Sequence, residues 1–153
     1  GYNLSNHDAF NENNLTEIGQ TESGIPIILN SDWVKSDFKI TTGFVEPHFF
    51  AGFSGGPKMI APGLAGFETI MNLHDSDMIN HPNSIWGVTH GNPIHDSIRE
   101  IATISPPDFS LDVTINKNHK MIPKMTLSRC AWRSKYVISV FWGSPGAHGV
   151  KNM

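Results

Sequence analysis

The chain of 153 residues, with 39% hydrophobic residues and a net charge of −3, is long enough for one domain with a core or for part of a larger domain. The small negative charge gives no field that would gather nucleic acid or an anionic membrane, and no apolar run approaches the roughly 20 residues of a membrane span. The single cysteine, Cys130, excludes an internal disulfide framework and fits a reducing compartment, so we expect a cytoplasmic protein.

The beginning of the chain predicts a polar loop followed by a buried strand. Residues 1–23 are polar and rich in asparagine, and only a short element around Leu15–Ile18 is expected there. His7 lies in the turn-like sequence NHD, which predicts a solvent-exposed loop histidine. The short apolar run Ile25–Leu29 is typical of a buried strand.

A short helix and a second strand are expected next. Ser31 can cap the helix, whose inward-facing residues are then Trp33, Val34 and Phe38. The run Phe38–Val45 is rich in β-branched and aromatic side chains and predicts a strand. Because proline lacks an amide donor, this strand has to end before Pro47.

The stretch from Gly43 to His74 combines many glycines and prolines with many apolar residues. A flexible linker has no use for Phe, Ile, Leu or Met, so these glycines indicate buried backbone that passes close to a ligand or another main chain. The loop from His48 to Pro62 begins at the carboxyl end of the expected strand. In open α/β sheets, ligands collect at that edge.

Two helices are expected after this loop. The segment Gly66–His74 would place four residues on one face, with the histidine pointing the same way as the apolar side chains: Phe67, Ile70, Met71 and His74. In the second helix Asn92 is the N-cap and Pro93 the first helical residue. Its inner stripe would consist of Ile94, Ile98, Ile101 and Ala102.

The last third of the chain predicts a hairpin and then an irregular segment. The run Phe109–Ile115 alternates like a strand, Asn116–Asn118 is a turn, and Lys120–Ile122 can pair back as a hairpin. The pattern is irregular from Pro123 onward, although Tyr136–Trp142 is compatible with a strand. Together these elements predict an α/β fold, a partial open sheet with flanking helices.

Most of the eight histidines need no functional explanation. His95, in the first turn of the second helix, is expected at the surface. Four others are expected to be surface or hydrogen-bonded core residues: His81, His90, His119 and His148.

Three side chains in the glycine-rich stretch are candidates for chemistry. His48 precedes an aromatic pair, and a histidine held against aromatic walls can exchange a proton near neutral pH. Lys58 follows two glycines and a proline, and desolvation would lower its pKa and make its amine a nucleophile or covalent anchor. His74 can offer a ring nitrogen to a metal, although its spacing is equally typical of a core histidine. A phosphate clamp at Lys58 is disfavoured because the GxxxxGK[ST] spacing fails.

Three segments together carry a family resemblance. EPHFFAGFSGGPK, the following IAPGLAGFETIMNLH and the helix GNPIHDSIRE closely resemble the nickel-dependent lactate racemase family, from about Asp32 to Ile122. The resemblance implies a fragment of the larger N-terminal domain of a two-domain enzyme, and an initial Gly in place of Met fits an internal piece. Residues 1–122 would belong to that domain, residues 123–153 match poorly, and the carboxyl-terminal domain is expected to be absent.

The resemblance also implies roles for individual residues. In that family the cofactor is a nicotinate-derived mononucleotide whose two sulfur-bearing arms hold nickel, a nickel-pincer nucleotide. Lys58 would be its covalent anchor through a thioamide, His74 the nickel ligand, and His48 one of two catalytic histidines. The main chain would lie close to the cofactor at Gly52, Gly55 and Gly56, for which tight turns alone are the alternative. Phe50 would pack against the cofactor, with plain core packing as the alternative.

The implied reaction is racemisation or epimerisation of a small, lactate-like 2-hydroxy acid. His48 would remove the hydroxyl proton while the cofactor accepts the Cα hydride, and the planar 2-keto acid could take the hydride back on either face. The implied partners are this substrate and the enzymes that make the cofactor. The second catalytic histidine and the groups that hold the substrate are expected outside this chain, so the fragment alone is not expected to be active.

Two other functions remain open from the sequence. One is a protein that carries the cofactor through Lys58 and His74 without turnover. The other is a generic α/β nucleotide-binding module, which the glycine-rich loop alone would permit.

Overall fold

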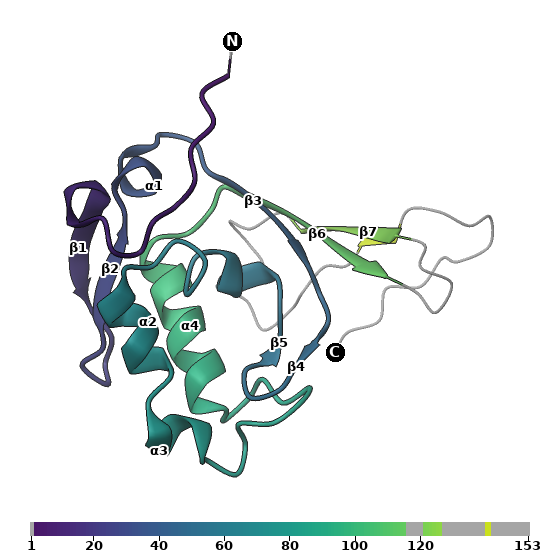
Figure 1. Cartoon of the computed structure of the whole chain (residues 1–153). Coiled ribbons are helices and arrows are strands. Elements are labelled where there is room, and N and C mark those ends of the chain that lie inside the picture. Colours follow the sequence, from purple (N-terminus) through teal and green to yellow (C-terminus); the bar gives the residue numbers. More distant parts are fainter. Residues whose placement is uncertain (1, 116–120, 127–139, 142–153) are drawn as a thin grey trace.

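The computed structural model describes residues 2–115, 121–126 and 140–141. It has the α/β architecture that the sequence predicts, with small sheets flanked by short helices (Figure 1). Helix α2 (Phe67–Leu73) packs against both strand β2 (Pro26–Asn30) and helix α4 (Pro93–Ile104). The larger sheet extends away from these helices, to the right in Figure 1.

The beginning of the chain forms a hairpin. After the short 3-10 helix η1 (Glu12–Asn14), strand β1 (Leu15–Gln20) pairs antiparallel with β2. The short element expected near residue 15 is therefore a full strand, and the buried strand expected at 25–29 is confirmed as β2. Ile27 and Leu29 of β2 are completely buried in the core.

Helix α1 (Ser31–Lys35) follows β2, and its cap differs from the prediction. The side chain of Asn30 accepts hydrogen bonds from the backbone nitrogens of Asp32 and Trp33, so Asn30 is the N-cap and the prediction of Ser31 is wrong by one residue. Trp33 is buried as expected. Phe38 is 67% exposed, contrary to expectation, because the helix ends before it.

His7 is not the solvated loop residue that its neighbours suggest. Its Nε2 donates to the carbonyl of Ala65 at 2.9 Å, and its Nδ1 accepts from the side-chain amide of Asn30 at 3.2 Å. The prediction failed because both partners are far from His7 in the sequence and no local pattern announces them.

The larger sheet has the strand order β3-β6-β7-β8. Strand β3 (Ile40–Phe44) pairs parallel with β6 (Phe109–Ile115), and β6 pairs antiparallel with β7 (Met121–Thr126). Both predicted strands and the antiparallel pairing of the second one are confirmed, while the turn expected at 116–118 lies outside the described residues. Strand β7 continues past Pro123, where an irregular segment was expected. Strand β8 (Val140–Phe141) falls within the expected strand at 136–142, whose other residues lie outside the described ones, as do His119 and His148.

Helix α4 matches its predicted pattern. Asn92 caps it, Pro93 begins it, and the predicted stripe is buried: Ile94, Ile98, Ile101 and Ala102. Helix α3 (Ser76–Ile79) precedes it and packs against it. Among the described residues, no helix is long and apolar enough to cross a membrane.

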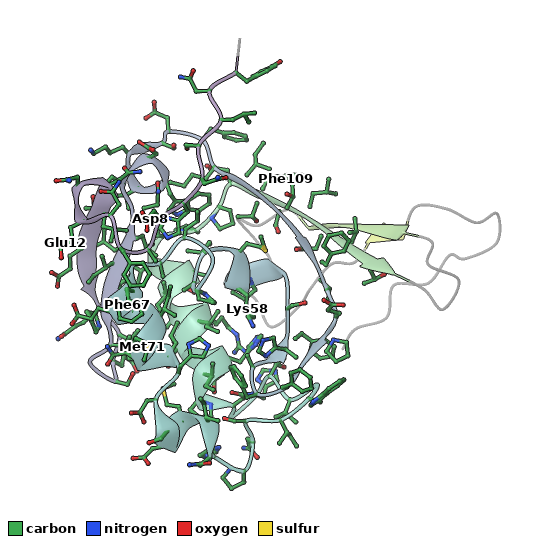
Figure 2. The ribbon with its side chains drawn as sticks, in the orientation of Figure 1. Asp8, Glu12, Lys58, Phe67, Met71 and Phe109 are labelled. Atoms are coloured by element: carbon green, nitrogen blue, oxygen red, sulfur yellow. The ribbon has the colours of Figure 1, made fainter. Side chains whose placement is uncertain are left out.

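Helix α2 turns only part of the predicted face inward: Ile70 packs against the core and His74 is partly buried, but the other two residues are not. Phe67 and Met71 are 45% and 51% exposed, and Figure 2 labels both on α2, away from Lys58 in this view. The buried residues are Thr69 and Leu73. The reason is polar: Thr69 Oγ1 donates to the carbonyl of Pro26 at 2.7 Å and accepts from the backbone nitrogen of Ile28 at 3.0 Å, which docks the helix on β2.

Candidate functional site

The loop that follows β3 is more ordered than the sequence suggests. Strand β4 (Pro47–His48) pairs with β5 (Gly52–Phe53) in a tight antiparallel hairpin, and the 3-10 helix η2 (Gly56–Met59) follows. The hairpin places His48 at the start of its tip. Residues 49–51 form the turn, and Ala51 is completely buried.

Phe50, in this turn, lies between two histidines. Its ring meets the ring of His48 edge-on at a centroid distance of 4.7 Å and that of His74 at 5.4 Å. Both interplanar angles are close to perpendicular, an arrangement that aromatic rings favour. Phe50 therefore brings together the hairpin and the end of α2, which carry the two candidate histidines.

His74 is the C-cap residue of α2, and its side chain is partly buried. Its Nδ1 donates to the carbonyl of Ile70 at 2.7 Å, which fixes the tautomer that has a free lone pair on Nε2. Metal-binding histidines commonly donate their other ring N–H to a backbone carbonyl in this way. His74 is therefore prepared to act as a ligand through Nε2.

Lys58 belongs to η2 and reaches into the region between α4 and the β4–β5 hairpin (Figure 2). Burial lowers the pKa of its ammonium group below the ordinary value, the direction expected for a desolvated amine. Burial first, and then the positive charges of Lys58 and His74, lower the pKa of His48. Phe50 contacts the rings of both histidines, and Lys58 acts on His48 through its charge.

His48 also has a defined tautomer. Its Nδ1 accepts a hydrogen bond from the backbone nitrogen of Ala51 at 3.3 Å, so the proton of the neutral ring lies on Nε2. The lowered pKa keeps the ring neutral at neutral pH. In this arrangement His48 presents a hydrogen-bond donor at Nε2.

The two glycines before Lys58 have a backbone conformation that favours glycine. Gly55 and Gly56 have φ angles of +72° and +52°, and a Cβ on Gly55 would lie 2.7 Å from the carbonyl oxygen of Phe44. Gly52 also has a positive φ, +77°, and a Cβ there would collide with the carbonyl of Val88. Tight packing of backbone against backbone thus accounts for Gly52 and Gly55.

Sequence reasoning missed the residue that anchors this turn. Asp112 of β6 is buried, and its Oδ1 accepts from the backbone nitrogen of Gly56 at 3.0 Å. Ser110 donates to the other carboxylate oxygen at 2.8 Å, and Thr41 donates to Ser110 at 3.0 Å. The available signal was a carboxylate in the polar row Ser110, Asp112 and Thr114, which alternates with the apolar residues of the strand.

Another missed residue is His95, which was expected at the surface. It is only 8% exposed, and its Nδ1 donates to the carbonyl of Ala51 at 2.9 Å. Burial is the main cause of its lowered pKa. His81 and His90 are exposed, as expected.

A hollow of about 610 Å³ borders the other side of Lys58. Its walls come from β3, β6 and the glycine turn, and include Phe44, Gly55 and Leu111. His48 and His74 do not line it, so Lys58 borders both this hollow and the histidines. Among the described residues there is no group of three or more His, Cys, Asp or Glu side chains that could hold a metal ion. A metal at His74 would therefore need donors that come with a bound group or from another part of the protein.

Residues 1–87 match the family model described as the lactate racemase N-terminal domain. The chain belongs to this family. It is 40% identical over 116 residues to the lactate racemase of Thermoanaerobacterium thermosaccharolyticum and 36% identical over the same length to that of Lactiplantibacillus plantarum. Each match covers 76% of this chain but only 27% of the relative.

Solved structures agree with the membership in this family. The structure of the T. thermosaccharolyticum lactate racemase apoprotein matches with a TM-score of 0.73 and 41% identity, over 75% of this chain and 28% of the other. A crystal structure of a protein from Thermotoga maritima matches with a TM-score of 0.63 and 24% identity, over 88% of this chain and 34% of the other, which supports the fold alone. This lactate racemase N-terminal domain is thus an α/β unit with the expected fold class.

Proposed function

We propose that this chain forms the cofactor-bearing part of a racemase or epimerase of a small 2-hydroxy acid, with lactate as the first substrate to test. Its membership in the lactate racemase N-terminal domain family supports the reaction class. The observations that carry the proposal are the two histidines on either side of Phe50 and the desolvated amine of Lys58, whose charge lowers the pKa of His48.

The described residues fit the nickel-pincer nucleotide that the family resemblance implies. Lys58 offers the amine for the covalent link, since burial lowers its pKa and so raises the fraction of neutral, nucleophilic amine. His74 offers a free Nε2 to the nickel, whose other donors would belong to the cofactor. Gly55 and Gly56 are proposed to bring the main chain next to the cofactor at Lys58, Gly56 being partly exposed and Gly55 buried, and Phe50 offers an aromatic ring. When bound, the cofactor supplies the acceptor and donor for the substrate hydride.

His48 is the proposed acid–base residue for the substrate hydroxyl group. Its lowered pKa favours the neutral ring, the form that can accept a proton. With Ala51 bonded to Nδ1, however, Nε2 already carries the ring proton, so His48 becomes a base only after this hydrogen bond is released. At 3.3 Å the bond is long, and its release costs no more than about 1 kcal/mol.

The complete reaction needs more than this chain. The chain spans 27% of the length of the lactate racemases that it matches, and the second catalytic histidine and the substrate-holding groups are proposed to come from elsewhere in the protein. The proposed partners are the substrate and the enzymes that synthesise the cofactor. The proposed location is the cytoplasm, where Cys130 would stay reduced.

Intact-protein mass spectrometry tests the cofactor attachment. The complete gene product, co-expressed with the cofactor-making enzymes, should carry an adduct that disappears in Lys58→Ala and remains in Lys35→Ala, an exposed lysine of α1. A generic nucleotide-binding module predicts no covalent adduct. Absence of the adduct in the unaltered protein, under conditions that load a known lactate racemase, would refute the proposed attachment.

Racemisation tests the catalytic role. With D- or L-lactate, conversion to the other enantiomer should be lost in His48→Ala, while the exposed histidine variant His90→Ala should stay active. A protein that carries the adduct but converts neither enantiomer would support the carrier function instead. Full activity of His48→Ala would exclude this residue as the acid–base group.

A further inference from the structure

Three consecutive carbonyls at the tip of the His48 hairpin are each held by one downstream segment, residues 87–95. Phe50 accepts from the side chain of Asn92 at 2.8 Å, Ala51 from His95 Nδ1 at 2.9 Å, and Gly52 from the backbone nitrogen of Gly87 at 3.0 Å. The turn that carries Phe50 is therefore fixed residue by residue by the start of α4 and the loop before it.

Both side-chain donors are buried and have little freedom to move. Asn92 is fully buried, and while its Nδ2 donates to Phe50 and Val88, its Oδ1 accepts from the backbone nitrogens of Ile94 and His95. This amide thus caps α4 and holds the hairpin at once. The same loop also touches the hairpin directly, since any Cβ on Gly52 would collide with Val88.

These contacts lead to the ring of His48. The carbonyl of Phe50 and the N–H of Ala51 belong to one peptide group, which accepts from Asn92 on one side and donates to His48 Nδ1 on the other. A hydrogen bond to the carbonyl polarises the amide and strengthens its N–H as a donor. His95 holds the next peptide group, so neither can rotate away from His48.

We propose that Asn92 and His95 are positioning residues for His48: by holding the peptides at Phe50 and Ala51 they fix the backbone that places the His48 ring for turnover, and in the protein without cofactor they keep the ring proton on Nε2 through the hydrogen bond from Ala51. The ring effect is independent of the reaction, whereas the effect on turnover rests on the proposed function. Neither residue touches the reacting atoms in this scheme. They act through the backbone of the hairpin.

Kinetics of the complete gene product, loaded with cofactor, provide the first test. His95→Leu removes the donor to Ala51, and Asn92→Ser keeps an oxygen for the helix cap but removes the amide donor to Phe50. Both should lower kcat for lactate racemisation roughly tenfold, as expected for a misplaced catalytic group, with KM and the mass of the Lys58 adduct unchanged. His95→Asn, whose amide nitrogen can replace Nδ1, should restore most of the turnover, and His90→Leu should have no effect.

The second test measures the tautomer of the His48 ring. In 15N-histidine-labelled protein without cofactor, the His48 resonances are assigned by their loss in His48→Gln. They should report the Nε2–H tautomer in the unaltered protein. In His95→Leu and Asn92→Ser they should shift toward a mixture of the two tautomers. Unchanged His48 resonances in both variants would overturn the proposal, as would unchanged kcat in an active enzyme. If the protein does not racemise lactate, the resonances alone decide the positioning role and the proposed function fails separately. If His95→Leu does not fold, Asn92→Ser and His95→Asn give the same decision.

Discussion

Helices α2 and α4 lie side by side and both border the candidate site, yet they are built differently. Helix α4 buries the apolar stripe that its sequence displays and begins with a side-chain cap. Helix α2 lacks a side-chain cap, leaves Phe67 and Met71 exposed, and docks through the hydroxyl group of Thr69. The comparison teaches that a buried polar contact, here that of Thr69 beside the buried Leu73, can rotate a short helix away from the face that its apolar pattern predicts.

The largest expected effect comes from the apolar face of α4. Replacing Ile98, which is 1% exposed, with Ala should lower the free energy of unfolding by about 3 kcal/mol, because it removes buried apolar surface and leaves a cavity. Urea-induced unfolding followed by circular dichroism measures this change. A loss no larger than that of an exposed residue would mean that α4 is not the better-packed helix.

The polar docking of α2 should have a smaller effect. Thr69→Val keeps the shape of the side chain but leaves the carbonyl of Pro26 and the backbone nitrogen of Ile28 without this partner, so we expect a loss of about 1–2 kcal/mol. The same unfolding experiment applies. A neutral or stabilising effect would show that the hydroxyl group does not determine which face of α2 is buried.

The two helices should also differ in pH dependence, because the inner side of α4 carries His95. The pKa of His95 is lowered in the folded state, so below about pH 6.5 the unfolded chain binds more protons than the folded chain. The free energy of unfolding should therefore decrease as the pH is lowered. His95→Asn should make the total decrease smaller. The reduction should be about 1.4 kcal/mol for each unit by which the pKa of His95 differs between the folded and unfolded states. The lowered pKa of His48 has the same effect, so part of the pH dependence of the free energy of unfolding should remain in His95→Asn. Urea titrations at a series of pH values measure it, and equal slopes would contradict the assignment.

The smallest effect should come from the exposed face of α2. Met71→Ala, at a 51% exposed position, should change the free energy of unfolding by less than about 0.5 kcal/mol. It serves as the matched control for Ile98→Ala, since each variant shortens a large apolar side chain on a neighbouring helix. A loss as large as that of Ile98→Ala would mean that Met71 is covered in the protein in solution.

The sequence predicted those features that depend on local pattern. The cap and stripe of α4, the positions of strands β3 and β6 and the pairing of β6 with β7 all follow from residue spacing and turn chemistry, whereas the parallel pairing of β3 with β6 was not predicted. The candidate residues Lys58, His48 and His74 were found through motif and family resemblance, and the structure brings them to one region. Their roles in binding and catalysis stay predictions.

What the sequence did not reveal depends on contacts between distant segments. His95 looked like a surface residue in a helix turn, but its partner, the carbonyl of Ala51, lies 44 residues away. Asp112 was not singled out in the sequence, but it accepts a hydrogen bond from the amide of Gly56, 56 residues away. The inward face of α2 was misjudged because the hydrogen bonds of Thr69 depend on strand β2. No periodicity encodes such partners.

The pairing of the three carbonyls of residues 50–52 with donors from residues 87–95 has an evolutionary consequence. Insertion or deletion of a single residue in either segment would shift donors out of step with acceptors, whereas many substitutions between them would not. Homologues should therefore vary in the side chains of these two segments while conserving their lengths, and length changes should gather in other loops.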